Sequence, residues 1–238
     1  MTNVQFRLYL TSEDKRDHGY LARNLAAYTS HPVAVPNCRL SDSDNKLQHP
    51  AHAQDILQLL TFLLSWRGPA ECESPPYDPD KFFLMGHSCS AHMLASVILD
   101  SSEPALMPSP DLLQAIRGVI FSEGIYNIDA LLQSFPTYRN WFIADAFGDL
   151  SNYNQYSVTN MPLREGASHI HWIIVHTRGD TLVDVRQSEG MYENLRNQGA
   201  GRVLKSWDDL EDGHNEVLQS RKFLQIVGDF ILYSATTI

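Results

Sequence analysis

The stretch KFFLMGHSCS, residues 81–90, decides the fold of this chain. It contains an apolar run of strand length, and residues 91–99 continue as an apolar stretch typical of a helix. Ser88 therefore lies at a sharp turn from strand to helix, flanked by Gly86 and Ser90. In the G-x-S-x-G nucleophile elbow, such a turn lifts the serine hydroxyl clear of the sheet, and small flanking residues let the two backbones approach closely. Ser88 is predicted to be a nucleophile; the alternative is a buried serine at a helix N-terminus.

Two later segments offer partners for Ser88. Residues 169–176 read HIHWIIVH, a buried strand, and Asp180 follows it, which places a carboxylate at the carboxyl end of a strand. Another short strand is predicted at residues 203–207, and His214 follows in a polar loop before the last helical stretch. The chain order serine, aspartate, histidine is that of α/β-hydrolases and differs from the orders in chymotrypsin and subtilisin.

The chemistry explains these residue types. A serine hydroxyl is a poor nucleophile at neutral pH, so a neutral imidazole must take its proton and return it to the leaving group. His214 fits that role, and a carboxylate must hold its imidazole in one tautomer. We assign the carboxylate to Asp180 over Asp184, which is expected inside the next helix; the alternative role for Asp180 is a turn residue or a helix N-cap. The backbone N–H of Cys89 is expected to donate to the oxyanion.

Further stretches extend the pattern beyond the elbow. They are residues 38–41 (CRLS), 49–55 (HPAHAQD), 124–128 (GIYNI), 135–138 (FPTY) and 146–148 (AFG). With the elbow, they make most of the chain resemble the fungal kynurenine formamidase group of α/β-hydrolases. The resemblance implies hydrolysis of an N-formyl amide or an ester by a triad of Ser88, Asp180 and His214.

The segment after the first strand differs from that family. Its members carry a His-Gly-Gly motif there, whose backbone N–H groups complete the oxyanion hole. Here residues 4–10 lead into Thr11 and Ser12 without a glycine pair, and His18-Gly19 opens the next helical stretch. Thr11 and Ser12 are the candidates for the second donor, and loss of one donor costs about 10²–10³ in turnover. The departure favours a slow or specialised member.

Length and composition predict one globular domain over residues 1–238. The net charge of −10, from 28 acidic and 18 basic residues, argues against nucleic acid or an anionic membrane as a partner. The start of the chain lacks the pattern of a signal peptide. The 3 cysteines, an odd count without metal-ligand spacing, indicate reduced thiols, no metal site and a cytoplasmic protein. We expect a small-molecule substrate and no cofactor, and the sequence is compatible with a homodimer.

Strand and helix patterns alternate along the chain. Strands are predicted at residues 4–10, 32–36, 81–85, 118–122, 169–176 and 203–207, and helices at 19–28, 50–66, 91–99, 183–197 and 216–233. This alternation is typical of the α/β class, with a mostly parallel twisted sheet and helices on both faces. Together with the elbow it predicts the α/β-hydrolase fold.

Residues 123–162 interrupt the alternation, and aromatic residues gather there. We predict a small helical cap, or lid, whose apolar side shapes the pocket. Tyr126, Trp141 and Phe142 are candidate substrate contacts, with packing of the cap against the sheet as the alternative role. His87 is a further candidate because it precedes the nucleophile on the oxyanion side.

Three functions fit these patterns. The first is a metal-free serine hydrolase, an esterase or amidase, that acts on small hydrophobic or aromatic esters or formyl amides. The second is an enzyme of a specialised pathway that uses Ser88 and His214 for acyl transfer, cyclisation or rearrangement. The third is a binding protein that retains the pocket. The order of the triad favours catalysis, whereas the Thr11-Ser12 segment favours the latter two functions.

Overall fold

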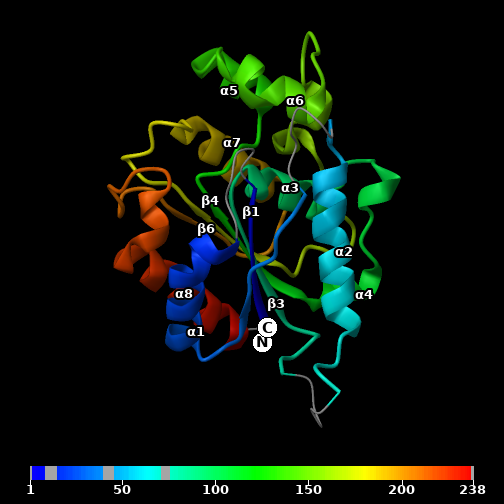
Figure 1. The fold of residues 1–238 in the computed structure, drawn as a ribbon, viewed down its shortest axis with the longest axis vertical. Helices are drawn as coiled ribbons and strands as arrows, with labels where there is room; N and C mark the ends of the chain where they lie inside the picture. The colour runs from blue at the N-terminus through cyan, green and yellow to red at the C-terminus, as the bar shows by residue number, and fades with distance from the viewer. Residues whose placement is uncertain (1, 9–14, 40–45, 71–75, 237–238) are drawn as a thin grey trace.

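A single parallel sheet forms the centre of the molecule. The computed structural model describes residues 2–8, 15–39, 46–70 and 76–236. Within these residues the strands pair in the order β2-β1-β3-β4-β5-β6, and every pair is parallel (Figure 1). The strands are β1 (Thr2–Leu8), β2 (Val33–Ala34), β3 (Phe82–Ser88), β4 (Ile116–Ser122), β5 (His171–Val175) and β6 (Val203–Ser206).

Helices cover both faces of the sheet, as the alternation predicts. One face carries α1 and α8, and the other carries α2, α3, α4 and α7 (Figure 1). The helices are α1 (Gly19–Thr29), α2 (Ala51–Ser65), α3 (Cys89–Ile98), α4 (Pro110–Ala115), α5 (Ile128–Ser134), α6 (Ala144–Phe147), α7 (Val185–Asn197) and α8 (Arg221–Thr236). No helix of the described ranges combines the length and the apolar character needed to cross a lipid bilayer.

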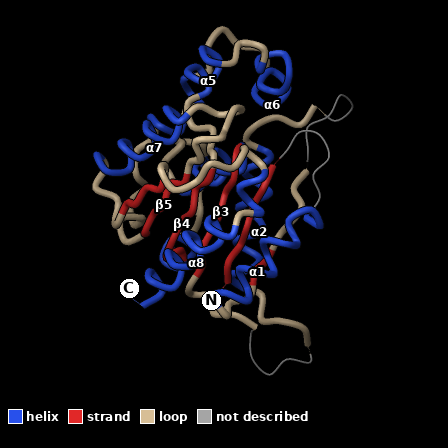
Figure 2. The backbone as a smooth tube through the Cα atoms, turned by 90° about the vertical axis from the view of Figure 1, so that its left-hand side faces the viewer, coloured by secondary structure: helices blue, strands red, loops and turns tan. Residues whose placement is uncertain are grey.

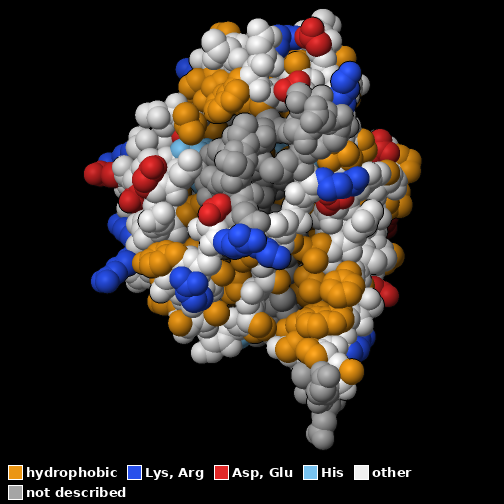
Figure 3. All heavy atoms as spheres, in the orientation of Figure 1, with side chains coloured by type: hydrophobic (Ala, Val, Ile, Leu, Met, Phe, Trp, Pro, Cys, Tyr) orange, Lys and Arg blue, Asp and Glu red, His pale blue; other side chains and the backbone are white. Residues whose placement is uncertain are grey.

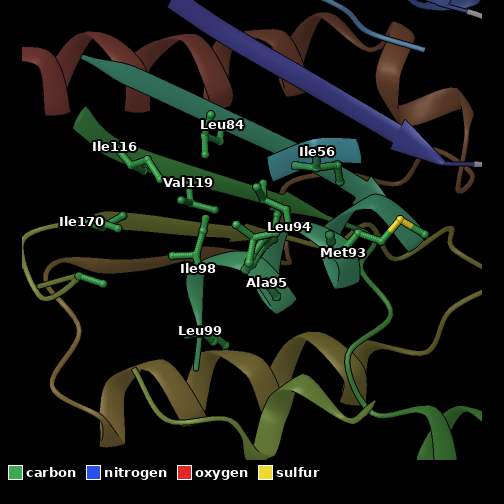
Figure 4. Packing of buried hydrophobic residues seen from close by; sticks show 14 of the residues in the cluster. Ile56, Leu84, Met93, Leu94, Ala95, Ile98, Leu99, Ile116, Val119 and Ile170 are labelled. Carbon is green, nitrogen blue, oxygen red and sulfur yellow. The ribbon is translucent and has the colours of Figure 1, made fainter. Parts of the chain in front are cut away.

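The core is divided between the two faces because side chains alternate along a strand. Leu84 of β3 packs in the cluster that includes Leu94 and Ile98 of α3 (Figure 4). Phe83, its neighbour in β3, packs on the other face with Phe223 of α8. Every residue of β3 is buried, as expected for a central strand of a parallel sheet covered on both sides.

The segment predicted as a cap lies beyond the carboxyl ends of the strands. Figures 1 and 2 show α5 and α6 at that end of the molecule, with a π-helical turn at Arg139–Ile143 between them in the chain. A separate apolar cluster holds this region together and includes Ile125, Tyr138, Phe142 and Tyr153. Its role as a lid over a substrate stays a prediction.

Several helix boundaries differ from the expected ones. Helix α7 begins at Val185 and not at residue 183, because Asp180 Oδ1 accepts hydrogen bonds from the backbone N–H groups of Leu182 and Val183 and forms a turn there. The predicted helix at residues 216–233 is interrupted: a 3₁₀ turn, Glu216–Gln219, precedes α8.

On the face drawn in Figure 3, Lys and Arg side chains are scattered among acidic and apolar ones.

Candidate active site

Ser88 lies on the strained turn that the sequence predicts. Strand β3 ends at Ser88, α3 begins at Cys89, and the serine has φ 55° and ψ −124°. A non-glycine residue in this region costs on the order of 1–3 kcal/mol and persists only where the surrounding structure enforces it. Gly86 is required by the same turn, because a Cβ there would lie 2.8 Å from the backbone N and Cα of Ala91. Ser90 is fully buried in the position where the motif has its second glycine.

Asp180 contacts His214 directly. The Nδ1 atom of His214 lies 2.7 Å from Asp180 Oδ2, and both side chains are buried. The backbone N–H groups of Leu182 and Val183 donate to Oδ1 at 2.8 Å and 3.0 Å and fix the carboxylate. Asp184 does not make this contact; it precedes α7 at the N-cap position and makes no side-chain capping bond.

The pKa of Asp180 reflects two opposing causes. Burial alone raises the pKa of this carboxyl, but the hydrogen bond and the charge of His214 oppose that effect. A hydrogen bond from Glu123 and one from the backbone of Val183 also favour the charged form. The pKa of Asp180 is therefore held below its usual value, and Asp180 is a carboxylate at neutral pH.

The imidazole of His214 also lies beside the nucleophile elbow. The rings of His214 and His87 are 4.8 Å apart between centroids, and His87 is the residue directly before Ser88. His87 is fully buried, and its Nδ1 lies 3.1 Å from the Oγ of Ser122 at the end of β4. The carboxyl ends of adjacent strands thus bring residues distant in the sequence to one place.

Glu123 is a functional candidate that the sequence reasoning missed. It directly follows β4, its side chain is fully buried, and its backbone has φ 49°. The backbone N–H of Thr177 donates to its Oε1 at 3.0 Å, and Nδ1 of His176 lies 3.4 Å from its Oε2. Its position directly after a predicted strand, the same feature that identified Asp180, could have pointed to Glu123 in the sequence.

Glu123 is protonated at neutral pH. Burial, followed by the hydrogen bond and the charge of Asp180, raises the pKa of Glu123 to about 10. Burial likewise lowers the pKa of His176, so the contact between Glu123 and His176 joins neutral groups and is not an ion pair. Ligand atoms of Glu123, Asp180 and His214 lie within 4.8 Å of one another, a spacing that also fits a metal ion. Hydrogen bonds among the three groups account for that spacing.

An apolar pocket opens beside the elbow. It holds about 440 Å³ of empty space, part of it open to solvent, between α3 and the capping segment. The backbone N–H of Ile125, one of its lining residues, donates to the carbonyl oxygen of Ser88 at 3.4 Å. The residues that shape it include Cys89, His92, Ile125, Phe142, Ile143 and Phe147.

The predicted substrate contacts occupy different places. Phe142 lines the pocket, whereas Trp141 has 53% of its surface exposed and lies outside the pocket lining. Tyr126 is fully buried and packs against Phe121 of the sheet, which is the structural role given above as its alternative. Thr11 and Ser12, the predicted oxyanion donors, lie outside the described residues.

Comparison with curated proteins identifies relatives. No family model matches the chain. The chain is 22% identical over 200 residues to a kynurenine formamidase of Meyerozyma guilliermondii. The matched region covers 82% of this chain and 70% of that protein. It is 24% identical over 229 residues to a kynurenine formamidase of Scheffersomyces stipitis, and this match covers 85% of this chain and 81% of that protein.

Solved structures give the fold. A truncated carbohydrate esterase from gut microbiota superposes with a TM-score of 0.71 at 15% identity, over 99% of this chain and 86% of that one. The esterase of Pyrobaculum calidifontis gives a TM-score of 0.71 at 15% identity, over 99% and 77%. The chain has the α/β-hydrolase fold and is similar in sequence to kynurenine formamidases. Both the resemblance and the fold class predicted for this α/β-hydrolase are thereby confirmed.

Proposed function

We propose that this α/β-hydrolase is a serine hydrolase that cleaves a small aromatic amide or ester, with formyl amides as its preferred substrates. The observation that carries the proposal is the 2.7 Å contact between His214 Nδ1 and Asp180 Oδ2, beside the strained elbow at Ser88. A nucleophile, a base and a residue that orients the base are thereby gathered at the carboxyl end of one sheet.

The reaction follows from these positions. Because Nδ1 of His214 is held by Asp180, Nε2 is the nitrogen left to take the Ser88 proton as Oγ attacks the substrate carbonyl. The oxyanion of the tetrahedral intermediate accepts from the backbone N–H of Cys89. Collapse breaks the bond to the amine or alcohol, which leaves with the proton from His214. Water, deprotonated by His214, then hydrolyses the acyl-enzyme and restores Ser88.

The pocket and the relatives support the substrate class. The pocket is lined by apolar and aromatic side chains, including Phe142 and Phe147, which suit a flat aromatic group. The curated relatives are named kynurenine formamidases. An aryl formamide would place its formyl carbon at Ser88 and its ring in the pocket. The products are then formate and the free aryl amine.

Labelling with a fluorophosphonate probe tests the nucleophile without a known substrate. Intact-mass measurement should show one adduct on the parent protein and none on Ser88→Ala or His214→Ala. Formanilide hydrolysis by the same proteins then tests the substrate class. Equal labelling of Ser88→Ala would remove this serine from the mechanism.

Paired variants of the two aspartates test the acid. Asp180→Asn is expected to lower kcat by about 10³–10⁴, because the imidazole loses the partner that fixes its tautomer. Asp184→Asn, the matched control, should stay within about tenfold of the parent, since Asp184 makes no contact with His214. The reverse ranking would transfer the role to Asp184.

A second candidate function is acyl transfer to a nucleophile other than water. Thr11 and Ser12 stand where related enzymes carry a glycine pair, which predicts poor stabilisation of the oxyanion and slow turnover of ordinary esters and amides. N-formylkynurenine and p-nitrophenyl esters would then both be poor substrates. Formamidase turnover at the ordinary enzymatic scale of about 10 s⁻¹ would contradict this second function.

A further inference from the structure

His92 is a buried polar residue in the wall of the apolar pocket. Its exposed fraction is 2%, and neither of its ring nitrogens makes a hydrogen bond of ordinary geometry with the described residues, although the backbone of Ile125 is close enough to affect its pKa. A buried polar atom left without a partner costs about 1–3 kcal/mol. Native proteins retain such an atom where a ligand, water or a functional role accounts for it. His92 therefore requires an explanation that the triad does not provide.

The position of His92 on α3 places its ring close to the reaction centre. It lies three residues after Cys89, the first residue of α3, and helical side chains at this spacing share one face and lean toward the N-terminus. The ring consequently covers the first turn of α3, which begins at Cys89, and both residues line the same pocket. The rings of Phe147 and His49 pack edge-on against it, at 5.4 Å and 5.9 Å between centroids.

The ring of His92 is neutral. Burial, and then the neighbouring His49, lowers the pKa of His92 to about 3, against a smaller opposing effect of the Ile125 backbone. A neutral imidazole offers one N–H donor and one acceptor nitrogen. Such a ring is suited to a neutral polar group and unsuited to a carboxylate or ammonium, which would have to enter an apolar pocket unpaired.

We propose that His92 is a specificity-determining residue whose ring N–H hydrogen-bonds a neutral carbonyl oxygen carried by the aromatic part of the substrate. The aromatic and apolar side chains of the pocket hold the ring of that substrate, and His92 selects rings that carry an acceptor. This inference rests on the proposed function for its reaction, but the binding preference itself does not require catalysis.

Binding measurements in a Ser88→Ala background isolate that preference. Two ligands of nearly equal size are compared, acetophenone, which carries a carbonyl acceptor, and isopropylbenzene, which does not. The ratio of their Kd values is measured by calorimetric titration, first with His92 present and then with His92→Leu. We expect His92→Leu to reduce the preference for acetophenone by roughly three- to tenfold, the range of one neutral hydrogen bond. Met93→Leu, a volume-conserving change in the same pocket lining, is the control and should leave the ratio unchanged.

A spectroscopic measurement covers the case in which His92→Leu does not fold. Acetophenone should shift the ring-nitrogen NMR resonances of His92 in the Ser88→Ala protein, whereas isopropylbenzene should not. An unchanged Kd ratio in His92→Leu, unshifted nitrogens, or no binding of acetophenone would overturn the proposal. Failure of the proposed function is seen separately, as absence of fluorophosphonate labelling at Ser88.

Discussion

Two carboxyl groups in the site have opposite charge states, although they lie side by side. Asp180 is ionised because His214 holds its pKa low against the effect of burial. Glu123 is protonated because burial and the charge of Asp180 raise its pKa to about 10. Neighbouring carboxyls with separated pKa values divide the roles, so that one bears the charge and the other donates a hydrogen bond to it.

Glu123→Gln tests this division of charge. The folded-state pKa of Glu123 lies above its usual value of 4.5, so the folded protein retains a proton that the unfolded chain loses as pH rises. The contribution of this group to stability is thus fully present below pH 4.5 and is lost as pH rises toward about 10.

Glutamine keeps an N–H donor for Asp180 and cannot titrate. In urea unfolding between pH 6 and 9, the free energy of unfolding of Glu123→Gln should therefore fall less steeply with pH than that of the parent. The turnover at pH 7 should remain within about tenfold of the parent, because the amide preserves the hydrogen bond. Identical pH slopes for the two proteins would show that Glu123 is ionised in the folded state.

The residues of the site differ in how far the sequence revealed them. Asp180 follows a strand and precedes a helix, so its position suggested both its role and its alternative as a turn residue. Glu123 follows a strand in the same way, but its charge state depends on burial and on Asp180, which approach it only in the folded chain. His92 could not be separated from a core histidine, because the surroundings of its ring nitrogens are a three-dimensional property.

The β3–α3 turn is the element on which the site depends. Its strand, turn and helix could be predicted because an apolar run, a small-residue motif and an apolar helix follow one another without a gap. The 3₁₀ turn before α8 could not be predicted from the sequence, since residues 216–233 carry one continuous apolar pattern. The backbone N–H of Ser220 there bonds to Val217 and ends the turn before α8 starts.

Two glycine substitutions test the closeness of strand and helix at this turn. Gly86→Ala places a methyl group 2.8 Å from backbone atoms of Ala91, so α3 must move away from β3. We expect a loss of about 1–3 kcal/mol in stability and a fall in labelling of Ser88 by the probe. Gly190→Ala is the matched control, because its methyl group would meet only Thr159 Cγ2 at 3.6 Å and it lies inside α7. It should stabilise the protein by about 0.5–1 kcal/mol.

Urea unfolding measures both effects, and the probe reports the geometry of the elbow. A Gly86→Ala protein as stable and as reactive as the parent would mean that the turn has room for a side chain. In Gly86→Ala the helix must move as a unit relative to the strand, since the clash involves backbone atoms that cannot rotate away.

At the scale of the whole molecule, the two faces of one sheet support separate apolar clusters. Leu94 of α3 belongs to one cluster and Phe223 of α8 to the other, and both side chains are fully buried. Because adjacent residues of the same strands contribute to both clusters, the faces should unfold together. Leu94→Ala and Phe223→Ala are each expected to lower the free energy of unfolding by about 2–5 kcal/mol.

The two variants also test the prediction of a single domain. In thermal unfolding, tryptophan fluorescence and far-UV circular dichroism should give one coincident transition, shifted to lower temperature in each variant. Separate transitions, of which each variant shifts only one, would show that the two faces are independent folding units.

The place of β1 in the sheet has a consequence for synthesis in the cell. This strand precedes the other described strands in the sequence, yet it lies between β2 and β3, and Thr2 pairs with Phe82. At about 5–20 residues per second of translation, the ribosome needs several seconds after making β1 before its main partner exists. Throughout that interval the nascent chain presents an unpaired strand edge, a template for wrong association. The pairing of β1 with β3 therefore cannot form before residue 88 has been synthesised.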